Sequence, residues 1–401
     1  MKSFTPAQFR QQFPALNETG CYLDSAATAL KPQAVIEATG QFYRLSAGSV
    51  HRSQFAAARR LTENYENARG QVARLLNAPE AHSIVWTKGT TEAINLVAQS
   101  WLRPRLAPGD EILVSEAEHH ANLVPWLMVA EQTGARVVKW PIGADRLPDL
   151  ALLPGLLNSR TRLLAIGQMS NVTGGCPDLA KIIPLAHAAG AKVMVDGAQG
   201  VVHCPPDVQA LDIDFYAFSG HKLYGPMGIG ALYGKPALLA QMAPWQGGGK
   251  MLTTVSFEGF TPQAVPWCFE AGTPNVIAVA GLSAALEWLS TVDVAAAERW
   301  SCDLCDLAEA QLSALPGFRS HRSSGSSVLA FDIVGVHHSD VVTLLAESGI
   351  SVRAGQHCAQ PLLAALGVSG TLRASFAPYN TLSDVDALVA AMTTALTLLA
   401  D

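Results

Sequence analysis

The chain has 401 residues, 15% of them charged, and a formal net charge of -6. This acidic balance argues against a nucleic-acid groove, because phosphate binding needs a positive field and no run of Lys or Arg supplies one. No uninterrupted apolar segment approaches the ~18 to 20 residues that span a bilayer, and the first residues lack the pattern of a signal peptide. We therefore expect a soluble cytoplasmic protein with no nucleic-acid or membrane partner.

The seven cysteines are odd in number and scattered along the chain, which does not suit a disulfide framework. A reducing compartment fits them better. Most should be small buried residues, the usual fate of a free cysteine.

Two helical patterns open the chain, at 33–46 and 56–76, where apolar residues recur at intervals of three and four. From Ile84 onward, short apolar runs alternate with helical segments, which is typical of a parallel sheet with crossover helices. The strands expected for a mostly parallel seven-stranded sheet are 84–87, 111–115, 136–141, 162–168, 192–196, 214–218 and 229–233. A regular helix is expected between each of the first five.

After about Asn275 the composition shifts to helices rich in Ala and Leu. The later elements expected are helices at 276–290 and 294–315, strands near 327–331, 351–353 and 371–376, and a last helix at 383–399. We predict a large α/β domain at 15–274 and a smaller α+β domain at 275–401, with residues 1–14 packing on the smaller one.

Polar residues follow five of the expected strands, and ligands of parallel sheets gather at the carboxyl ends of strands. The five segments are Lys88–Thr91, Glu118–His120, Gln168–Asn171, Asp196–Gln199 and Ser219–Lys222. So many polar strand ends are hard to explain by packing. They predict a site at this edge of the sheet.

Lys222 directly follows a buried strand, where its amine is well placed to form an imine with a carbonyl compound. Asp196 ends another apolar strand and needs a cationic or donating partner. A protonated pyridine nitrogen would supply one, as in pyridoxal-phosphate enzymes, and Gln199 is close enough in sequence to reach a ring substituent.

Two strand ends allow more than one interpretation. The turn Gly89–Glu92 suits a phosphate at a helix start, although an ordinary Thr cap gives the same pattern. His119 could stack on a flat cofactor, or with His120 form half of a metal site completed by His357 or Cys358. The close pairs of metal-ligand spacing are lacking, and no metal is expected.

Cys358 differs from the other cysteines, because it lies in a polar loop after a histidine and near an arginine. Those neighbours would favour an exposed thiolate nucleophile, and an incidental loop cysteine is the alternative. Arg373, on a later strand, could clamp a substrate carboxylate through a bidentate contact. Its alternative is an inter-domain ion pair.

Taken in order over nearly the whole chain, eight segments resemble a cysteine desulfurase of the class V, fold-type I pyridoxal-phosphate enzymes. They are Asp24–Thr28, Ser49–Arg52, Gly89–Asn95, Glu118–Asn122, Asp196–Gln199, Ser219–Lys222, Glu270–Pro274 and Gly355–Ala359. Within that family the chain is most similar to group II desulfurases of the cysteine sulfinate desulfinase type, relatives of selenocysteine lyase.

The resemblance implies a role for each matching residue. Lys222 would attach the cofactor, Cys358 would receive sulfur and His119 would stack on the ring. The other cofactor contacts implied are Asp196, Gln199, Thr91, Ser219, His221 and, from the other subunit of a homodimer, Thr273. The substrate contacts implied are Asn171, Arg373, Ala26 and His51. Gln356 stands where group II relatives often have a second histidine, so no proton relay is assigned there.

The resemblance also implies the reaction, which takes sulfur, selenium or SO₂ from L-cysteine, L-selenocysteine or L-cysteine sulfinate and leaves L-alanine. A SufE-like protein would accept the sulfur, and iron–sulfur cluster assembly would use it. Two other functions are alternatives to desulfuration. One is an aminotransferase of small amino acids with the same cofactor, and the other is a non-catalytic sulfur-carrier protein.

Overall fold

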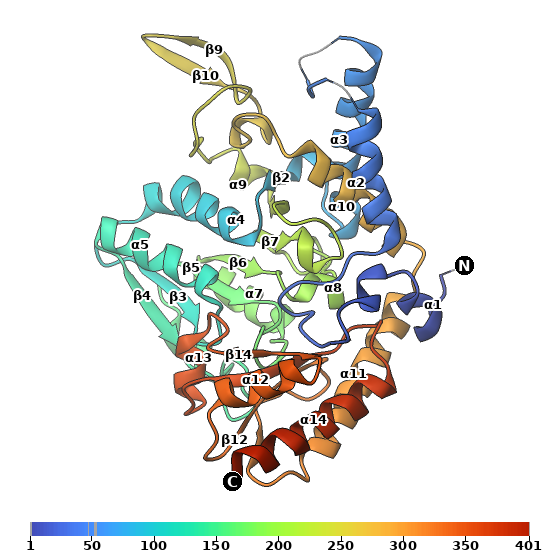
Figure 1. The fold of residues 1–401 in the computed structure, drawn as a ribbon. Helices are drawn as coiled ribbons and strands as arrows, with labels where there is room; N and C mark the ends of the chain where they lie inside the picture. Colours follow the sequence, from blue (N-terminus) through green and yellow to red (C-terminus); the bar gives the residue numbers. More distant parts are fainter. Residues whose placement is uncertain (1, 47, 52–53, 401) are drawn as a thin grey trace.

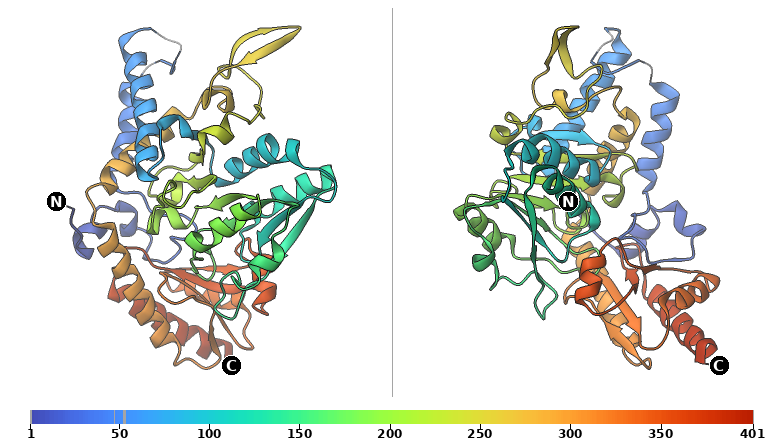
Figure 2. Two further views of the ribbon diagram at one scale, coloured as in Figure 1. Left: turned by 180° about the vertical axis from the view of Figure 1, so that it is seen from behind. Right: turned by 90° about the vertical axis from the view of Figure 1, so that its left-hand side faces the viewer.

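The structure, a computed structural model, describes residues 2–46, 48–51 and 54–400. A seven-stranded sheet occupies the middle of the molecule and carries helices on its faces (Figure 1). A four-stranded sheet with its own helices lies at the bottom of the same view, beside the C-terminus. The second view from the side separates the two parts clearly (Figure 2).

The central sheet has the strand order β2-β8-β7-β6-β5-β3-β4. Its strands are β2 (Ile84–Thr87), β3 (Glu111–Ser115), β4 (Arg136–Trp140), β5 (Thr161–Gly167), β6 (Lys192–Asp196), β7 (Phe215–Ser219) and β8 (Gly230–Gly234). All neighbours run parallel except the two pairs made by β8. The mostly parallel seven-stranded sheet and the α/β fold are thereby confirmed.

Helices fill the crossover connections, as parallel pairing requires. The helices of this part of the molecule, including those outside the crossovers, are α2 (Gln33–Leu45), α3 (Ala56–Leu75), α4 (Thr90–Leu96), α5 (Val124–Thr133), α6 (Leu153–Leu156), α7 (Leu179–Ala188), α8 (Gly200–His203) and α9 (Pro236–Leu239). The expectation of a regular helix between β4 and β5 is wrong, since α6 has only four residues. Pro154 and Gly155 within it are poor helix formers, which explains the short turn.

Helix α10 (Val276–Leu289) packs in the core of the large domain, although the predicted domain boundary after residue 274 placed it in the small domain. This helix lies against α2 and α3, and its Ala278, Leu282 and Leu286 join the core around the central sheet. The chain leaves that core only with α11 (Val294–Leu312), whose Leu304 and Ala308 pack under the small sheet. A composition rich in Ala and Leu cannot tell which of two cores a helix joins.

The small sheet is antiparallel, with strand order β11-β12-β15-β14. Its strands are β11 (Phe318–Ser320), β12 (Val328–Ile333), β14 (Arg353–Gly355) and β15 (Thr371–Ser375), and its helices are α12 (His338–Glu347), α13 (Gln360–Ala365) and α14 (Leu382–Ala400). Nearby, β1 (Cys21–Tyr22) pairs in parallel with β13 (Ile350–Ser351). Cys21 and Leu23 therefore join the small core, although the prediction placed residues from 15 onward in the large domain.

The N-terminal segment contacts both parts of the molecule. It contains the short helix α1 (Pro6–Arg10), and Phe9 and Phe13 pack in one cluster with Trp288 and Tyr379. Arg10 also forms an ion pair with Asp384 at the start of α14. This segment thus helps to hold the two cores together.

Helix α14, of 19 residues, is long and apolar enough to cross a membrane by length and composition, with a mean hydropathy of 1.5 over a window of 18 residues. One face of it, formed by Val385, Leu388 and Met392, is buried in the core of the small sheet. Such one-sided burial is the packing of an amphipathic core helix.

A hairpin that the sequence pattern did not indicate projects from the body of the protein at the top of Figure 1. It consists of β9 (Leu252–Ser256) and β10 (Gly259–Pro262), paired antiparallel. Val255, Phe257 and Phe260 on it are exposed. Apolar side chains gathered on a projecting element are typical of a surface that another protein covers.

A buried ion pair ties α3 to the segment that carries the Glu270–Pro274 motif. Arg69 is 0% exposed, and its guanidinium donates to Glu270 at 2.6 and 3.1 Å. Glu270 also accepts from the backbone N–H of Trp86, at 2.9 Å. Removing the arginine would leave a buried carboxylate without its countercharge.

Arg69→Met is therefore expected to lower the free energy of unfolding by about 3 to 5 kcal/mol, measured by urea denaturation of the cofactor-free chain. Arg319→Met is the matched control, because its ion pair with Asp332 lies on the surface. We expect the control to change stability by less than about 1 kcal/mol. Equal effects of the two variants would contradict the role assigned to Arg69.

Candidate functional site

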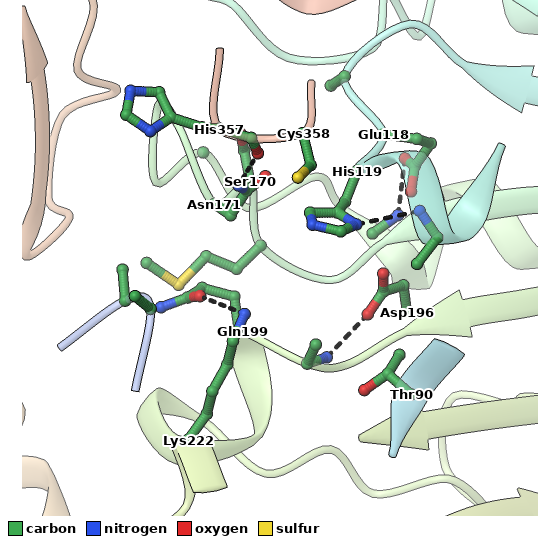
Figure 3. Close-up of a pocket in the computed structure, with 18 of the residues that line it drawn as sticks. Thr90, Glu118, His119, Ser170, Asn171, Asp196, Gln199, Lys222, His357 and Cys358 are labelled. Carbon is green, nitrogen blue, oxygen red and sulfur yellow. Dashed lines mark hydrogen bonds between the residues drawn. The ribbon is translucent and has the colours of Figure 1, made fainter. Parts of the chain in front are cut away.

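A cavity of about 580 Å³ lies at the carboxyl ends of the central strands, where the small domain covers it. Figure 3 shows side chains from both parts of the molecule pointing into it. The predicted site residues that line the cavity are Ala26, Thr91, His119, Asn171, Asp196, Gln199, Ser219, His221, Lys222, Cys358 and Arg373. The expectation that ligands bind at the carboxyl ends of parallel strands thus predicted most of the cavity residues contributed by the central sheet.

Lys222 ends the short turn Gly220–Lys222 that follows β7. Its Nζ lies 3.3 Å from Gln199 Oε1, and Figure 3 shows the two side chains meeting. Burial lowers the pKa of the Lys222 amine to about 8, and the nearby Arg373 and Arg353 act in the same direction, while Asp196 opposes them. A larger share of the amine is therefore neutral near pH 7, as a nucleophile or base requires.

This pKa leads to a prediction about the cofactor-free chain. The rate at which Lys222 reacts with added pyridoxal phosphate should rise with pH, with a midpoint near pH 8 and not near 10.5. The sign follows because only the neutral amine attacks a carbonyl, and burial shifts the amine toward neutrality. Stopped-flow absorbance measures this rate. A midpoint near the ordinary lysine value would contradict the burial argument.

Two carboxyl groups are buried at strand ends on either side of β5. Asp196 closes β6 and accepts from the backbone N–H of Ala198 at 2.9 Å, while burial raises its pKa. Glu118, which the sequence did not single out, accepts from Gly167 N–H at 2.8 Å and from the Asn122 side chain at 2.7 Å. Burial raises the pKa of Glu118 to about 8. Glu118 stood in the same strand-end motif as His119, which was the signal available.

His119 presents a neutral ring to the cavity. Its Nδ1 accepts from the backbone N–H of Ala121 at 3.0 Å, so the proton of the neutral ring sits on Nε2. Burial, assisted by the charge of Lys222, lowers the pKa of the imidazole to about 4. The ring lies between Cys358 and Asp196 in Figure 3.

Hydroxyl groups and a second neutral histidine form the end of the cavity near α4. Ser219 Oγ lies 2.9 Å from Thr90 N and 2.8 Å from Thr90 Oγ1, a contact that sequence reasoning missed although Thr90 adjoins Thr91. His221 Nδ1 lies 3.2 Å from Thr28 Oγ1, and burial lowers its pKa to about 4. Neutral donors at the start of a helix suit a phosphate group.

These donors fit pyridoxal phosphate. The hydroxyl-rich end provides donors for its phosphate, and the buried carboxylate of Asp196 can hold a protonated pyridine nitrogen, which removes the cost of burying that charge alone. His119 offers a flat face for the ring. Lys222 offers the amine that attaches the aldehyde. All four features line one cavity.

Arg373 lies at the small-domain side of the cavity and makes an ion pair, which was the alternative considered for it. Its Nη2 pairs with Asp24 at 3.1 Å, and its Nη1 donates to the Asn171 carbonyl at 3.0 Å. Its buried Nε has no hydrogen-bond partner among the described residues. Arg353, which also lines the cavity, pairs with the other oxygen of Asp24. The two guanidinium groups make this wall suitable for a carboxylate.

Cys358 follows β14 on a turn in which both His357 and Cys358 have positive φ, 51° and 53°. The turn buries His357 against Thr371 and leaves Cys358 exposed. The carbonyl of Cys358 accepts from His120 N–H at 2.7 Å, which ties this loop to the His119 segment. In Figure 3 the Cys358 sulfur faces His119 across the cavity.

Several residues predicted for the site do not line the cavity that the described residues form. His51 pairs with Glu66 at 2.8 Å, and Thr273 is exposed. Arg52 of the Ser49–Arg52 motif lies outside the described residues. The amide of Gln356 accepts from Gln360 at 2.6 Å and faces solvent. The roles implied for His51 and Thr273 remain predictions.

The comparisons with known proteins agree with this site. Residues 21–388 match the family described as aminotransferase class-V. The chain is 71% identical over 401 residues to cysteine desulfurase CsdA of Escherichia coli K12, covering 100% of both, and 49% identical over 396 residues to a probable cysteine desulfurase of Vibrio cholerae, covering 97% and 98%.

Solved structures give the same result. The crystal structure of E. coli CsdA, with an S-sulfonic acid, has a TM-score of 0.95 at 71% identity and covers 98% of this chain and 99% of its own. An apo cysteine desulfurase from Thermococcus onnurineus NA1 has a TM-score of 0.94 at 32% identity and covers 99% and 100%. The chain belongs to the aminotransferase class-V family.

Proposed function

We propose that this chain is a pyridoxal-phosphate-dependent group II cysteine desulfurase that converts L-cysteine to L-alanine and carries the sulfur on Cys358. The observation that carries this conclusion is that one cavity joins an amine, a buried carboxylate and an exposed thiol: Lys222, Asp196 and Cys358. An amine with a buried carboxylate serves carbon chemistry at an amino acid, and the thiol adds a sulfur acceptor.

Binding begins at the small-domain wall. The Arg373 guanidinium, which lines the cavity beside Asn171, holds the substrate carboxylate. The neutral Lys222 amine then takes the proton from Cα of cysteine. Pyridoxal phosphate, when bound, supplies the sink for the electron pair that this proton leaves behind.

Sulfur leaves in a second step at the exposed thiol. The Cys358 thiolate attacks the substrate sulfur, a new S–S bond forms, and the C–S bond breaks with its electron pair remaining on the carbon fragment. Protonation of that fragment yields alanine, and Cys358 is left as a persulfide. An acceptor thiol later takes the outer sulfur and frees Cys358 for another cycle.

The same cavity is proposed to act on L-cysteine sulfinate and L-selenocysteine. A sulfinate or selenide group departs from carbon more readily than a thiolate, so these substrates depend less on Cys358. The wall formed by Arg353 and Arg373 also suits the extra negative charge of a sulfinate.

The remaining proposals concern partners and place. A homodimer is supported by the projecting hairpin with exposed Phe257 and Phe260 and by the exposed position of Thr273. A SufE-like protein is proposed as the sulfur acceptor in iron–sulfur cluster assembly, which the solvent-exposed thiol supports. We also propose a cytoplasmic location, where free cysteines stay reduced.

The competing functions make different demands on the site. An aminotransferase of small amino acids has no use for an exposed thiol beside its amine. A sulfur carrier without catalysis has no use for the buried Asp196 or for a Lys222 amine whose pKa is lowered by burial.

The test is to purify the protein with its cofactor and measure alanine from cysteine, cysteine sulfinate and selenocysteine, each with and without a reducing thiol. We expect alanine from all three, with thiol accelerating turnover only for cysteine. Amino-group exchange with pyruvate and no sulfide release would favour the aminotransferase. Light scattering of the same sample measures whether it is a dimer.

A further inference from the structure

A second, smaller cavity also reaches Lys222. Its volume is about 40 Å³, and Lys222, Gln199 and Ala26 line both cavities. From Lys222 it extends to the side chains of His203 at the end of α8 and Glu298 on α11. Neither of these residues lines the substrate cavity formed by the described residues.

This cavity is large and polar enough for water. A buried water needs roughly 10 to 15 Å³ of cavity volume and two to four polar partners. Cavities lined only by apolar groups stay dry. Besides Lys222, the side chains on its wall that carry polar atoms are Ser25, Gln199, His203, Tyr224, Glu298 and Ser375. Ordered water in the cavity would therefore connect the Lys222 amine to His203.

His203 and Glu298 form a hydrogen-bonded pair with a path to solvent. His203 Nδ1 lies 2.8 Å from Glu298 Oε2, and the two side chains are 16% and 26% exposed. Burial opposes ionisation of Glu298, but His203 outweighs it and lowers the pKa of the carboxyl. The Glu298 carboxylate therefore stays available as a hydrogen-bond acceptor beside the imidazole.

The other groups around Glu298 keep its carboxylate in place. Its Oε1 accepts from Ser327 Oγ at 3.3 Å and from Cys302 Sγ at 3.6 Å. The titratable groups close enough to interact with its charge are Cys176, Cys302 and Tyr224. Burial is the main cause of their raised pKa values, and the charge of Glu298 adds to it. None of these groups carries positive charge to compete with His203.

A separate proton path has a clear use in the proposed reaction. In the proposed reaction Lys222 gains a proton from the substrate, and bound substrate and cofactor would separate the amine from solvent on the side of the large cavity. Exchange of that proton with solvent would then be slow unless another route exists. The second cavity offers that route.

We infer that the water-holding cavity behind Lys222 and the His203–Glu298 pair form a proton relay that exchanges the proton on Lys222 with solvent. This inference rests on the proposed function and adds two residues to it. The Lys222 ammonium gives a proton to cavity water, and that water passes a proton to Nε2 of His203. The imidazolium passes its Nδ1 proton to Glu298, whose partly exposed carboxyl releases it to bulk solvent, and the same steps in reverse bring a solvent proton to Lys222.

The test follows the α-hydrogen of unlabelled L-cysteine in heavy water during a single turnover of the cofactor-loaded enzyme. With the relay intact, Lys222 exchanges its proton before returning one, so the alanine carries mostly deuterium at Cα. In His203→Gln and Glu298→Gln the substrate's own hydrogen should be retained at least about twofold more often. Mass spectrometry of the alanine measures this fraction.

His187→Gln is the matched control, because His187 is also a histidine paired with a carboxylate, Asp214, yet lies away from both cavities. It should give the deuterium content of the unmodified enzyme. The visible absorbance of bound cofactor across pH is read in parallel and should shift its midpoint in the two relay variants only. Unchanged deuterium content and midpoint in both relay variants would overturn the relay, while absence of any alanine from the unmodified enzyme would overturn the proposed function instead.

Discussion

Replacing Lys222 by alanine is expected to lower alanine formation from cysteine by about 10³-fold or more, because the general base is lost. The visible absorbance of cofactor attached to Lys222 should disappear in the same variant. The physical reason is that Lys222 is the amine in the cavity that burial makes partly neutral, with its pKa at about 8. Single-turnover alanine release and absorbance spectra measure the two effects.

Lys235→Ala is the control for this experiment. Lys235 is also a lysine near a strand end, but its Nζ pairs with Asp212 and Asp214 away from the cavity. It should retain activity and spectrum. A small primary amine added to Lys222→Ala should restore part of the activity, since the truncated side chain leaves room for a base. Full activity of Lys222→Ala without added amine would contradict the assignment of Lys222 as the general base.

The part of the site built on the central sheet could be predicted because parallel strands end at one edge. His119, Asp196 and Lys222 are far apart in the sequence, yet Asp196 ends a buried strand and the other two lie within four residues of the end of one. Alternating apolar runs and helices predict the strands, and the strands then place the side chains. No knowledge of packing was needed for this step.

Other features depend on contacts between segments that no local pattern encodes. The raised pKa of Glu118 depends on its burial, and its two hydrogen-bond donors come from β5 and from Asn122. The exposure of Cys358 results from a turn with positive φ at two residues that are not glycine. Helix α10 joined the large core because α2 and α3 offered it an apolar surface. The exposed apolar residues of the hairpin, Val255, Phe257 and Phe260, join none of the hydrophobic cores of the described residues.

Replacing Cys358 by alanine is expected to separate the two kinds of substrate. Sulfur release from cysteine should fall by about 10²-fold or more, because no thiolate remains to attack the substrate sulfur. Alanine formation from cysteine sulfinate should be largely retained, since its leaving group departs without a nucleophile. The exposed position of Cys358 means that the substitution removes no buried contact of its side chain. Alanine from both substrates is measured under the same conditions.

The control is Cys204→Ala, another exposed cysteine, which lies outside both described cavities. It should leave both reactions unchanged. Mass spectrometry after one turnover with cysteine should find one added sulfur in the unmodified enzyme and in Cys204→Ala, and none in Cys358→Ala. Equal loss of both reactions in Cys358→Ala would mean that the thiol also serves substrate binding or proton transfer. Because Cys358 reaches the cavity from the small domain while Lys222 reaches it from the central sheet, a retained sulfinate reaction would assign carbon chemistry to one domain and sulfur transfer to the other.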